Sequence, residues 1–164
     1  ATHDVLTDLP TLRLASDRLE MAINAAMRHR KKSAVMFIDL DGFKTINDTL
    51  GHDAGDHVLK EAAGRMLSCV RHTDTVARVG GDEFLVISTE LNSAGDAAQI
   101  AENLIRGISQ PITLDNQQVV VGASIGIAVY PDHSLEMKEL IKKADAAMYR
   151  VKNSGKNSFA FAES

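Results

Sequence analysis

The stretch RVGGDEFLVI, Arg78–Ile87, places two glycines between two β-prone segments and follows them at once with two acids. A glycine pair between such segments is typical of a β-hairpin, because glycine accepts the positive φ that tight turns need. The stretch therefore predicts a hairpin whose second strand opens with Asp82 and Glu83. Consecutive strand residues point to opposite faces, so we expect only one of these acids to join other functional groups.

Apolar periodicity on both sides of the hairpin predicts an alternation of helices and strands. Helices are expected at residues 16–30, 42–51, 53–70, 93–109 and 134–152, and strands at 33–41, 74–79, 83–88, 117–130 and near Phe159. The central order, β-α-β-β-α-β, predicts an α+β fold with a mostly antiparallel sheet and helices packed on one face. Apolar residues of the helices are expected to gather on one inward face: Leu19, Ile23, Ala26 and Met27 in the first, and Val58, Leu59, Ala62, Ala63, Met66, Leu67 and Val70 in the third.

Composition limits the classes of function. The 164 residues are 45% apolar, which fits one globular domain, and the net charge of −4 argues against a nucleic-acid partner. A single cysteine, Cys69, excludes an internal disulfide framework. No apolar run approaches the ~20 residues of a membrane span, and no signal peptide is visible. The chain begins without Met, so we expect a piece of a longer protein.

A second acidic pair, Asp39 and Asp41, ends the strand expected at 33–41. Residues two apart on a strand share a face. Asp41 stands where the N-cap of the next helix belongs, and we expect that role for it. Asp39 lies inside the apolar run, where a metal ligand is the better explanation. With the hairpin acids it could hold Mg²⁺, which takes one or two carboxylates and leaves other positions to water and phosphate. The alternative for the hairpin is an exposed turn with solvated acids.

Segments along the whole chain resemble the GGDEF domain, the bacterial diguanylate cyclase family. They are HDVLTDLP (3–10), FIDLDGFKTINDTLGHDAGDHVL (37–59), RVGGDEF (78–84) and ADAAMYRVKNSGKN (144–157). They occur in the family's order, so residues 1–164 are interpreted as a single GGDEF domain. The resemblance implies a fold similar to nucleotidyl cyclase and polymerase palm domains. The first segment departs from the family, with Asp8 in place of a glycine and Thr11-Leu12 in place of Asn-Arg.

The family condenses two GTP molecules into cyclic di-GMP and releases two pyrophosphates. Carried onto this sequence, the resemblance makes Asp39, Asp82 and the backbone carbonyl of Leu40 ligands of Mg²⁺ or Mn²⁺. Glu83 falls at the second signature acid, which serves the metal site and catalysis. Divalent ions suit this reaction because phosphoryl transfer builds charge on oxygen atoms.

Other positions match those that bind GTP in the family. Asn47 and Asp56 correspond to the guanine readers, and their amide and carboxylate complement the donors and acceptors of that base. The remaining matches are Lys44, His52, Gly80, Gly81, Lys152 and Lys156. The lysines are expected to hold the triphosphate and the glycines to let the backbone approach it, whereas His52 is given no acid–base role. Without the resemblance, Asn47 and Asp56 would suit helix ends, and the lysines would suit solvent.

The segment RHTD, Arg71–Asp74, matches the family's product-inhibition motif, Arg-x-x-Asp before the glycine pair. Arg71 is expected to bind a guanine edge or a phosphate of cyclic di-GMP, and Asp74 to accept from guanine. The alternative is an exposed helix-end arginine and a turn aspartate.

The chain carries one set of GTP-binding residues and no internal repeat. Two equivalent bonds in the product then require a transient homodimer about a two-fold axis. We expect a cytoplasmic domain without direct membrane contact, which is compatible with a membrane anchor elsewhere in the parent protein. Alternatives are a GTP-binding regulatory module without turnover, attached for example to a cyclic di-GMP phosphodiesterase, and a cyclic di-GMP receptor.

Overall fold

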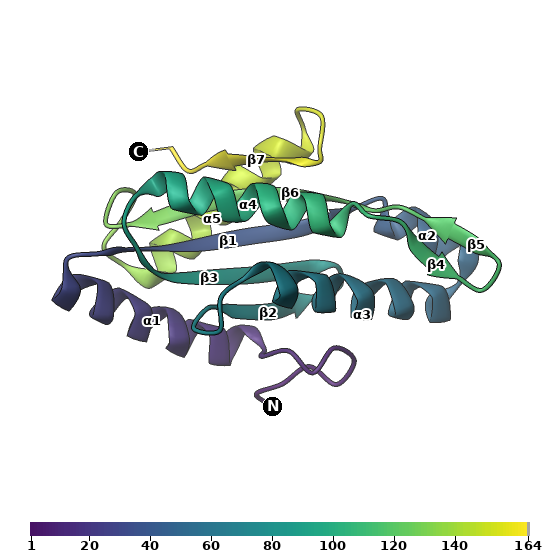
Figure 1. Cartoon of the computed structure of the whole chain (residues 1–164), viewed down its shortest axis with the longest axis horizontal. Helices are drawn as coiled ribbons and strands as arrows, with labels where there is room; N and C mark the ends of the chain where they lie inside the picture. The colour runs from purple at the N-terminus through teal and green to yellow at the C-terminus, as the bar shows by residue number, and fades with distance from the viewer. Residues whose placement is uncertain (164) are drawn as a thin grey trace.

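The computed structural model describes residues 1–163 and confirms the α+β fold (Figure 1). The helices are α1 (Leu12–His29), α2 (Phe43–Leu50), α3 (His52–Cys69), α4 (Ala94–Ile108) and α5 (Met137–Lys152). The strands are β1 (Lys32–Asp41), β2 (Thr75–Gly80), β3 (Glu83–Leu91), β4 (Ile112–Leu114), β5 (Gln117–Val119), β6 (Gly122–Tyr130) and β7 (Ser158–Phe161). The main sheet has the order β2-β3-β1-β6-β7, and β7 runs parallel to β6 while the other neighbours are antiparallel.

Helices cover both faces of the sheet, so the expectation of helices on one face is wrong. Met36 and Ile38 of β1 point into a core with α3 and α4. Val35 and Phe37 alternate with them and point into a second core with α1 and α5. The two extra helices lie outside the central β-α-β-β-α-β unit, and each has an apolar stripe that must be buried somewhere.

Two inward predictions for helix residues are wrong. In α1 the buried stripe comprises Ala15, Leu19, Ala22, Ile23 and Ala26, and Met27 lies just beyond its edge with 61% of its surface exposed. In α3 the stripe ends at Met66, and Leu67 is 53% exposed. Val70, by contrast, is partly buried against the core just after the helix ends. An apolar residue one position past a buried one is rotated by about 100° from it, which suffices to reach solvent.

The strand expected at 117–130 is divided. Its first part is β5, which pairs with β4 in a separate two-stranded ribbon, and its second part is β6 of the main sheet. Figure 1 shows the ribbon extending past one end of the sheet, near α2. The ribbon turns at Asp115, whose φ of 48° is left-handed and therefore ends the preceding strand. Uninterrupted β propensity gave no sign of the division.

Candidate active site

The acids that end β1 and begin β3 meet at one end of the sheet. Asp39 is paired directly with Glu83 in the antiparallel register, so both side chains lie on the face covered by α1 and α5. Lys152, the last residue of α5, reaches the same place. Its Nζ lies 3.3 Å from Oδ1 of Asp39 and 2.8 Å from Oδ1 of Asp41. The fold therefore gathers several carboxylates around one ammonium group.

The carboxylate of Asp39 is incompletely compensated. Its Oδ1 is buried and makes an ion pair with Lys152, but no hydrogen bond of good geometry reaches it. Burial raises the pKa of Asp39 to about 6, with a further increase from Asp82 that Lys152 only partly opposes. Burial and the charge of Asp39 likewise raise the pKa of Glu83. A cation beside these oxygens would be favourable, which is the first requirement of a metal site.

Asp82 also acts on Asp39, so the expectation that only one signature acid joins it is wrong. Asp82 precedes β3 and lies in the hairpin turn, where the alternation of a strand does not apply. Its charge is the second-largest cause of the raised pKa of Asp39. The backbone N–H of Leu40 donates to the carbonyl oxygen of Asp82 at 3.2 Å. The segments that carry the expected metal ligands are thus joined through their backbones.

The side chains present fit part of a Mg²⁺ coordination shell. Within residues 1–163, no group of three or more His, Cys, Asp and Glu is arranged to hold a metal ion unaided. Mg²⁺ needs no such group, because it is commonly held by one or two carboxylates together with water and the phosphates of a substrate. Oδ1 of Asp39, which accepts no hydrogen bond of good geometry, provides one such oxygen.

Asp41 does not cap the next helix, contrary to expectation. Gly42, with φ of 84°, is the N-cap of α2, and no side-chain cap bond is made there. Asp41 is instead 8% exposed, and accepts hydrogen bonds from the Ser124 hydroxyl (2.8 Å to Oδ1, 3.0 Å to Oδ2) and the Asn157 backbone N–H (2.8 Å). With Lys152 these contacts join β1, β6, α5 and the segment before β7. Sequence patterns assigned no role to Ser124 or Asn157.

The expected guanine readers lie on the two helices that follow β1. Asn47 is half-buried on α2, and Asp56 is exposed in the first part of α3. The corner between the helices is Gly51, whose φ of 94° suits glycine and whose N–H donates to the Asn47 carbonyl at 3.1 Å. Other expected nucleotide contacts are exposed at the same end of the sheet: Lys44 on α2, His52 at the start of α3, and Lys156 just before Asn157.

The glycine pair is open to solvent. A side chain added at Gly80 or Gly81 would meet nothing within 4 Å, and Gly81 has φ of 53°. Arg78 donates from Nε and Nη2 to the Gly81 carbonyl oxygen, at 3.0 and 2.8 Å. Its Nη1 contacts both carboxylate oxygens of Asp4, at 3.2 and 3.1 Å. The hairpin turn is therefore fastened to the N-terminal segment.

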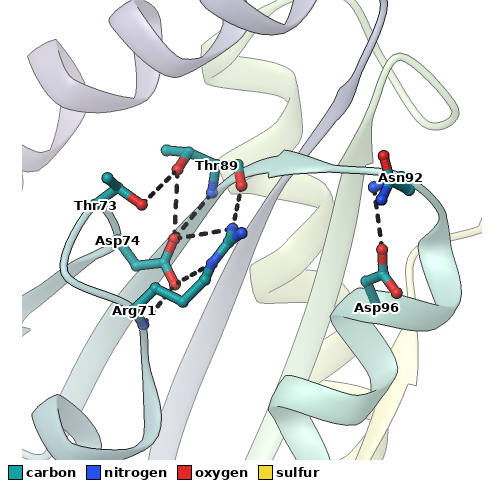
Figure 2. A network of polar contacts seen from close by, with 6 residues as sticks. All are labelled: Arg71, Thr73, Asp74, Thr89, Asn92 and Asp96. Carbon is teal, nitrogen blue, oxygen red and sulfur yellow. Dashed lines mark hydrogen bonds and ion pairs between the residues drawn. The ribbon is translucent and has the colours of Figure 1, made fainter.

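The Arg71–Asp74 motif forms a closed network, which Figure 2 shows. The carboxylate of Asp74 is fully buried and accepts from the backbone N–H groups of Arg71 (2.9 Å) and Thr89 (3.1 Å). The Arg71 guanidinium contacts Asp74 and the Thr89 carbonyl oxygen, while about half of that side chain stays exposed. The motif also borders a cavity of about 620 Å³ against Arg18 and Met21 of α1. Asp74 is thus already engaged, and Arg71 faces open space.

Comparisons with known proteins show the family of this chain. The family model described as diguanylate cyclase, GGDEF domain, matches residues 1–158. The bifunctional diguanylate cyclase/cyclic di-GMP phosphodiesterase MucR of Pseudomonas aeruginosa is 49% identical over 100% of this chain and 24% of its own length. Diguanylate cyclase TpbB of the same species is 46% identical over 99% of this chain and 38% of its own length. This chain therefore spans well under half of these curated relatives.

Solved structures show the same fold. The GGDEF domain of TpbB superposes with a TM-score of 0.95 at 45% identity, covering 98% of this chain and 94% of that one. The GGDEF domain of DgcB from Caulobacter crescentus, in complex with c-di-GMP, gives a TM-score of 0.89 at 30% identity, covering 100% of this chain and 97% of that one.

The fold defines a class of α+β domain in which acidic residues gather at one end of the sheet, beside a glycine hairpin. Within that class, the chain belongs to the diguanylate cyclase GGDEF domain family. No helix of residues 1–163 combines the length and apolar character that crossing a bilayer requires.

Proposed function

We propose that this domain condenses two GTP molecules into cyclic di-GMP. The observation that carries the proposal is the buried carboxylate of Asp39 among further carboxylates, with Lys152 as a cation that only partly offsets their charge, in a chain of this family. The 3′-hydroxyl oxygen of each GTP attacks the α-phosphorus of the other. A new P–O bond forms, the α–β anhydride bond breaks, pyrophosphate leaves, and the hydroxyl proton passes to solvent. Two such steps close the ring.

Asp39, Asp82 and the carbonyl oxygen of Leu40 would hold Mg²⁺ or Mn²⁺, with Glu83 beside them. Oxygen ligands of this kind suit both ions. When bound, the metal neutralises the charge that accumulates on the phosphate oxygens. The raised pKa values of Asp39 and Glu83 support this assignment, because they reflect burial and then the charges of neighbouring carboxylates, and a bound cation would offset both.

The chain's own cations would orient the triphosphate. Lys152 is held among acids that raise its pKa although burial lowers it, so it stays charged at neutral pH. Lys44 and Lys156 are exposed and free to reach phosphate oxygens. Where the family often has Arg, Lys156 offers a point charge rather than a bidentate contact. Asn47 and Asp56 would read the guanine base.

Two domains would act together about a two-fold axis. One domain supplies one set of GTP-binding residues, and the product contains two equivalent bonds. Each domain would present its GTP to the hydroxyl of the other, so the encounter is transient and depends on concentration. GTP as substrate places the domain in the cytoplasm.

The cavity beside Arg71 would bind the product and inhibit turnover. Arg71 is half-exposed there and offers a fork of donors that suits phosphate or a guanine edge. Asp74 would act differently from the sequence-based expectation, because its oxygens already hold Arg71 and Thr89. In this proposal it positions Arg71. Support comes from the DgcB domain, whose solved structure is a complex with c-di-GMP.

A regulatory module that binds GTP without turnover is the second candidate. The relative MucR is bifunctional and also carries a phosphodiesterase, so a domain of this kind occurs beside a second activity. A cyclic di-GMP receptor working through Arg71 is a third.

Incubation of the domain with GTP and Mg²⁺ separates these functions. We expect cyclic di-GMP and pyrophosphate in a 1:2 ratio by ion-exchange chromatography, and no product when EDTA removes the metal. Bound GTP without product would favour the regulatory module. Binding of cyclic di-GMP without binding of GTP would favour the receptor.

A further inference from the structure

Gly55 of α3 lies where any side chain would collide with Asn47. A Cβ built on Gly55 would be 2.4 Å from Oδ1 of Asn47, 3.2 Å from its Cγ and 3.3 Å from Cζ of Phe43. The first distance is shorter than real Cβ contacts allow. The amide of Asn47 therefore occupies the space that a side chain at Gly55 would fill.

Backbone conformation does not explain this glycine. Gly55 is buried in the first half of a regular helix, and it is not among the residues with positive φ. A glycine inside a helix costs about 1 kcal/mol relative to alanine. The absence of a side chain at Gly55 leaves room for the Asn47 amide. This amide packs against α3 at Gly55, the residue that precedes Asp56.

We propose that Gly55 is a specificity-determining positioning residue for the guanine base. The room left above the Cα of Gly55 allows the Asn47 amide to lie beside Asp56. The Asn47 amide and the Asp56 carboxylate can then present hydrogen-bond donors and acceptors to the same base. This inference rests on the proposed function, because it takes Asn47 and Asp56 as the residues that contact guanine.

The test variant is Gly55→Ala. The atoms in its way belong to the side chains of Asn47 and Phe43, so we expect Asn47 to rotate aside, Phe43 to shift by a few tenths of an ångström and the fold to survive, aided by the better helix propensity of alanine. Rotation moves the amide away from the base. We therefore expect GTP binding to weaken while the free energy of unfolding increases. Gly64→Ala is the matched control, because Gly64 lies on the same helix, is exposed and has nothing within 4 Å of an added Cβ.

Binding is measured by calorimetry with GTP and with ATP, in proteins that also carry Glu83→Gln to suppress turnover. We expect Gly55→Ala to weaken GTP binding about tenfold, equivalent to about 1.4 kcal/mol, and to leave ATP binding within about twofold. Gly64→Ala should change neither affinity. A Gly55→Ala protein that keeps the GTP affinity and the GTP-to-ATP preference of its parent would overturn the inference.

A double-mutant cycle with Asn47→Ala separates positioning from other effects. If Gly55 acts by making room for Asn47, Gly55→Ala has no further effect on GTP affinity once Asn47 is alanine. A further loss in that background would overturn the inference, whereas the proposed function would stand.

Urea unfolding of the same variants tests the contact without any nucleotide. We expect Gly55→Ala to stabilise the protein less than Gly64→Ala does when Asn47 is present, and this difference to shrink when residue 47 is alanine, with Phe43 as the remaining close neighbour. Absence of GTP binding in every protein would contradict the proposed function and, with it, the role in guanine recognition. If Gly55→Ala and Gly64→Ala stabilise the protein equally, both with Asn47 and with alanine at position 47, the contact between Gly55 and Asn47 would be overturned.

Discussion

Arg78 and Asp4 form an ion pair that fastens the signature hairpin to the N-terminal segment. Nη1 of Arg78 is 3.1 Å from Oδ2 of Asp4, and both side chains are largely buried. The same guanidinium binds the carbonyl oxygen of Gly81. One arginine thus connects a segment 74 residues away with the turn that contains Gly81 and Asp82.

Asp4→Asn should destabilise the fold. It removes the charge from a part-buried pair whose hydrogen bonds with Thr7 and Arg78 hold the pKa of Asp4 below its usual value although burial raises it. Charge-assisted hydrogen bonds are worth roughly 1.5–3 kcal/mol, so we expect a loss of about that size in the free energy of unfolding in urea. Asp8→Asn is the control, since Asp8 is exposed and asparagine tolerates its φ of 61°. Equal stability of Asp4→Asn and the wild type would contradict this.

The pH dependence of that loss has a definite sign. A carboxylate with a lowered folded pKa contributes stability above its unfolded pKa, near 4, and loses it as pH falls through the folded value. The stability difference between wild type and Asp4→Asn should therefore be full at pH 7 and shrink below about pH 4. A difference that grows on acidification would exclude the ion pair as its origin.

Glu83→Gln should remove turnover and leave the fold intact. The change is nearly isosteric, and it deletes a charge that faces Asp39 across the β1–β3 pair. Loss of one preorganised electrostatic group typically costs about 10²–10³ in kcat. We expect a loss of that order in the rate of cyclic di-GMP formation, with a thermal midpoint no lower than that of the wild type. A fully active variant would remove Glu83 from the site.

Asp41→Asn should lower the stability of the fold. Asp41 is buried with Lys152, Ser124 and Asn157 as donors, so a neutral amide leaves the ammonium without its nearest partner. Breaking a buried pair in this way costs about 3–5 kcal/mol, and partial exposure of Lys152 places our expectation at about 3 kcal/mol. Ser124→Ala, which removes a single neutral donor, should cost about 1 kcal/mol in the same urea titration. Similar losses for both variants would show that the pairing with Lys152 contributes little.

Arg71→Ala should relieve product inhibition and keep the initial rate. Arg71 lies in a cavity away from the acidic sheet end, on the side bordered by Arg18 and Met21. We expect cyclic di-GMP to bind at least about tenfold more weakly by calorimetry, consistent with the loss of charge-assisted bonds. Arg28→Ala, at the exposed end of α1, serves as the control. Unchanged affinity in Arg71→Ala would leave the RHTD segment with a structural role alone.

The sequence predicted most of the fold because its periodic segments were long and its hairpin signal was strong. The acidic pair Asp39 and Glu83 was predictable from strand ends that the antiparallel pairing brings together. The contacts of Asp41 were not, because they depend on Ser124 and Asn157, which are distant in sequence. A short acidic side chain at the end of a strand, such as Asp41, suits a helix cap as well as a buried hydrogen-bond network. Only the tertiary structure distinguishes the two roles.

Asp8, which stands where the family usually has glycine, has a local structural explanation. Its φ of 61° lies in the left-handed region, where the family's glycine is unstrained and aspartate is among the tolerated alternatives. The turn therefore keeps its shape, and Leu9 and Pro10 remain buried after it. Sequence comparison alone left the packing of this segment open, since it shows which residue changed and not the conformation that the position requires.

In the proposed reaction, two copies of this domain, each holding one GTP, make cyclic di-GMP together. The most direct test is the initial rate of product formation at saturating GTP and Mg²⁺ over a wide dilution series of the monomeric protein. If two copies must meet, as this proposal requires, the rate rises with about the square of protein concentration until association saturates, and specific activity increases when a leucine zipper is fused before Ala1. A specific activity that stays constant on dilution, or no product at any concentration, would contradict it.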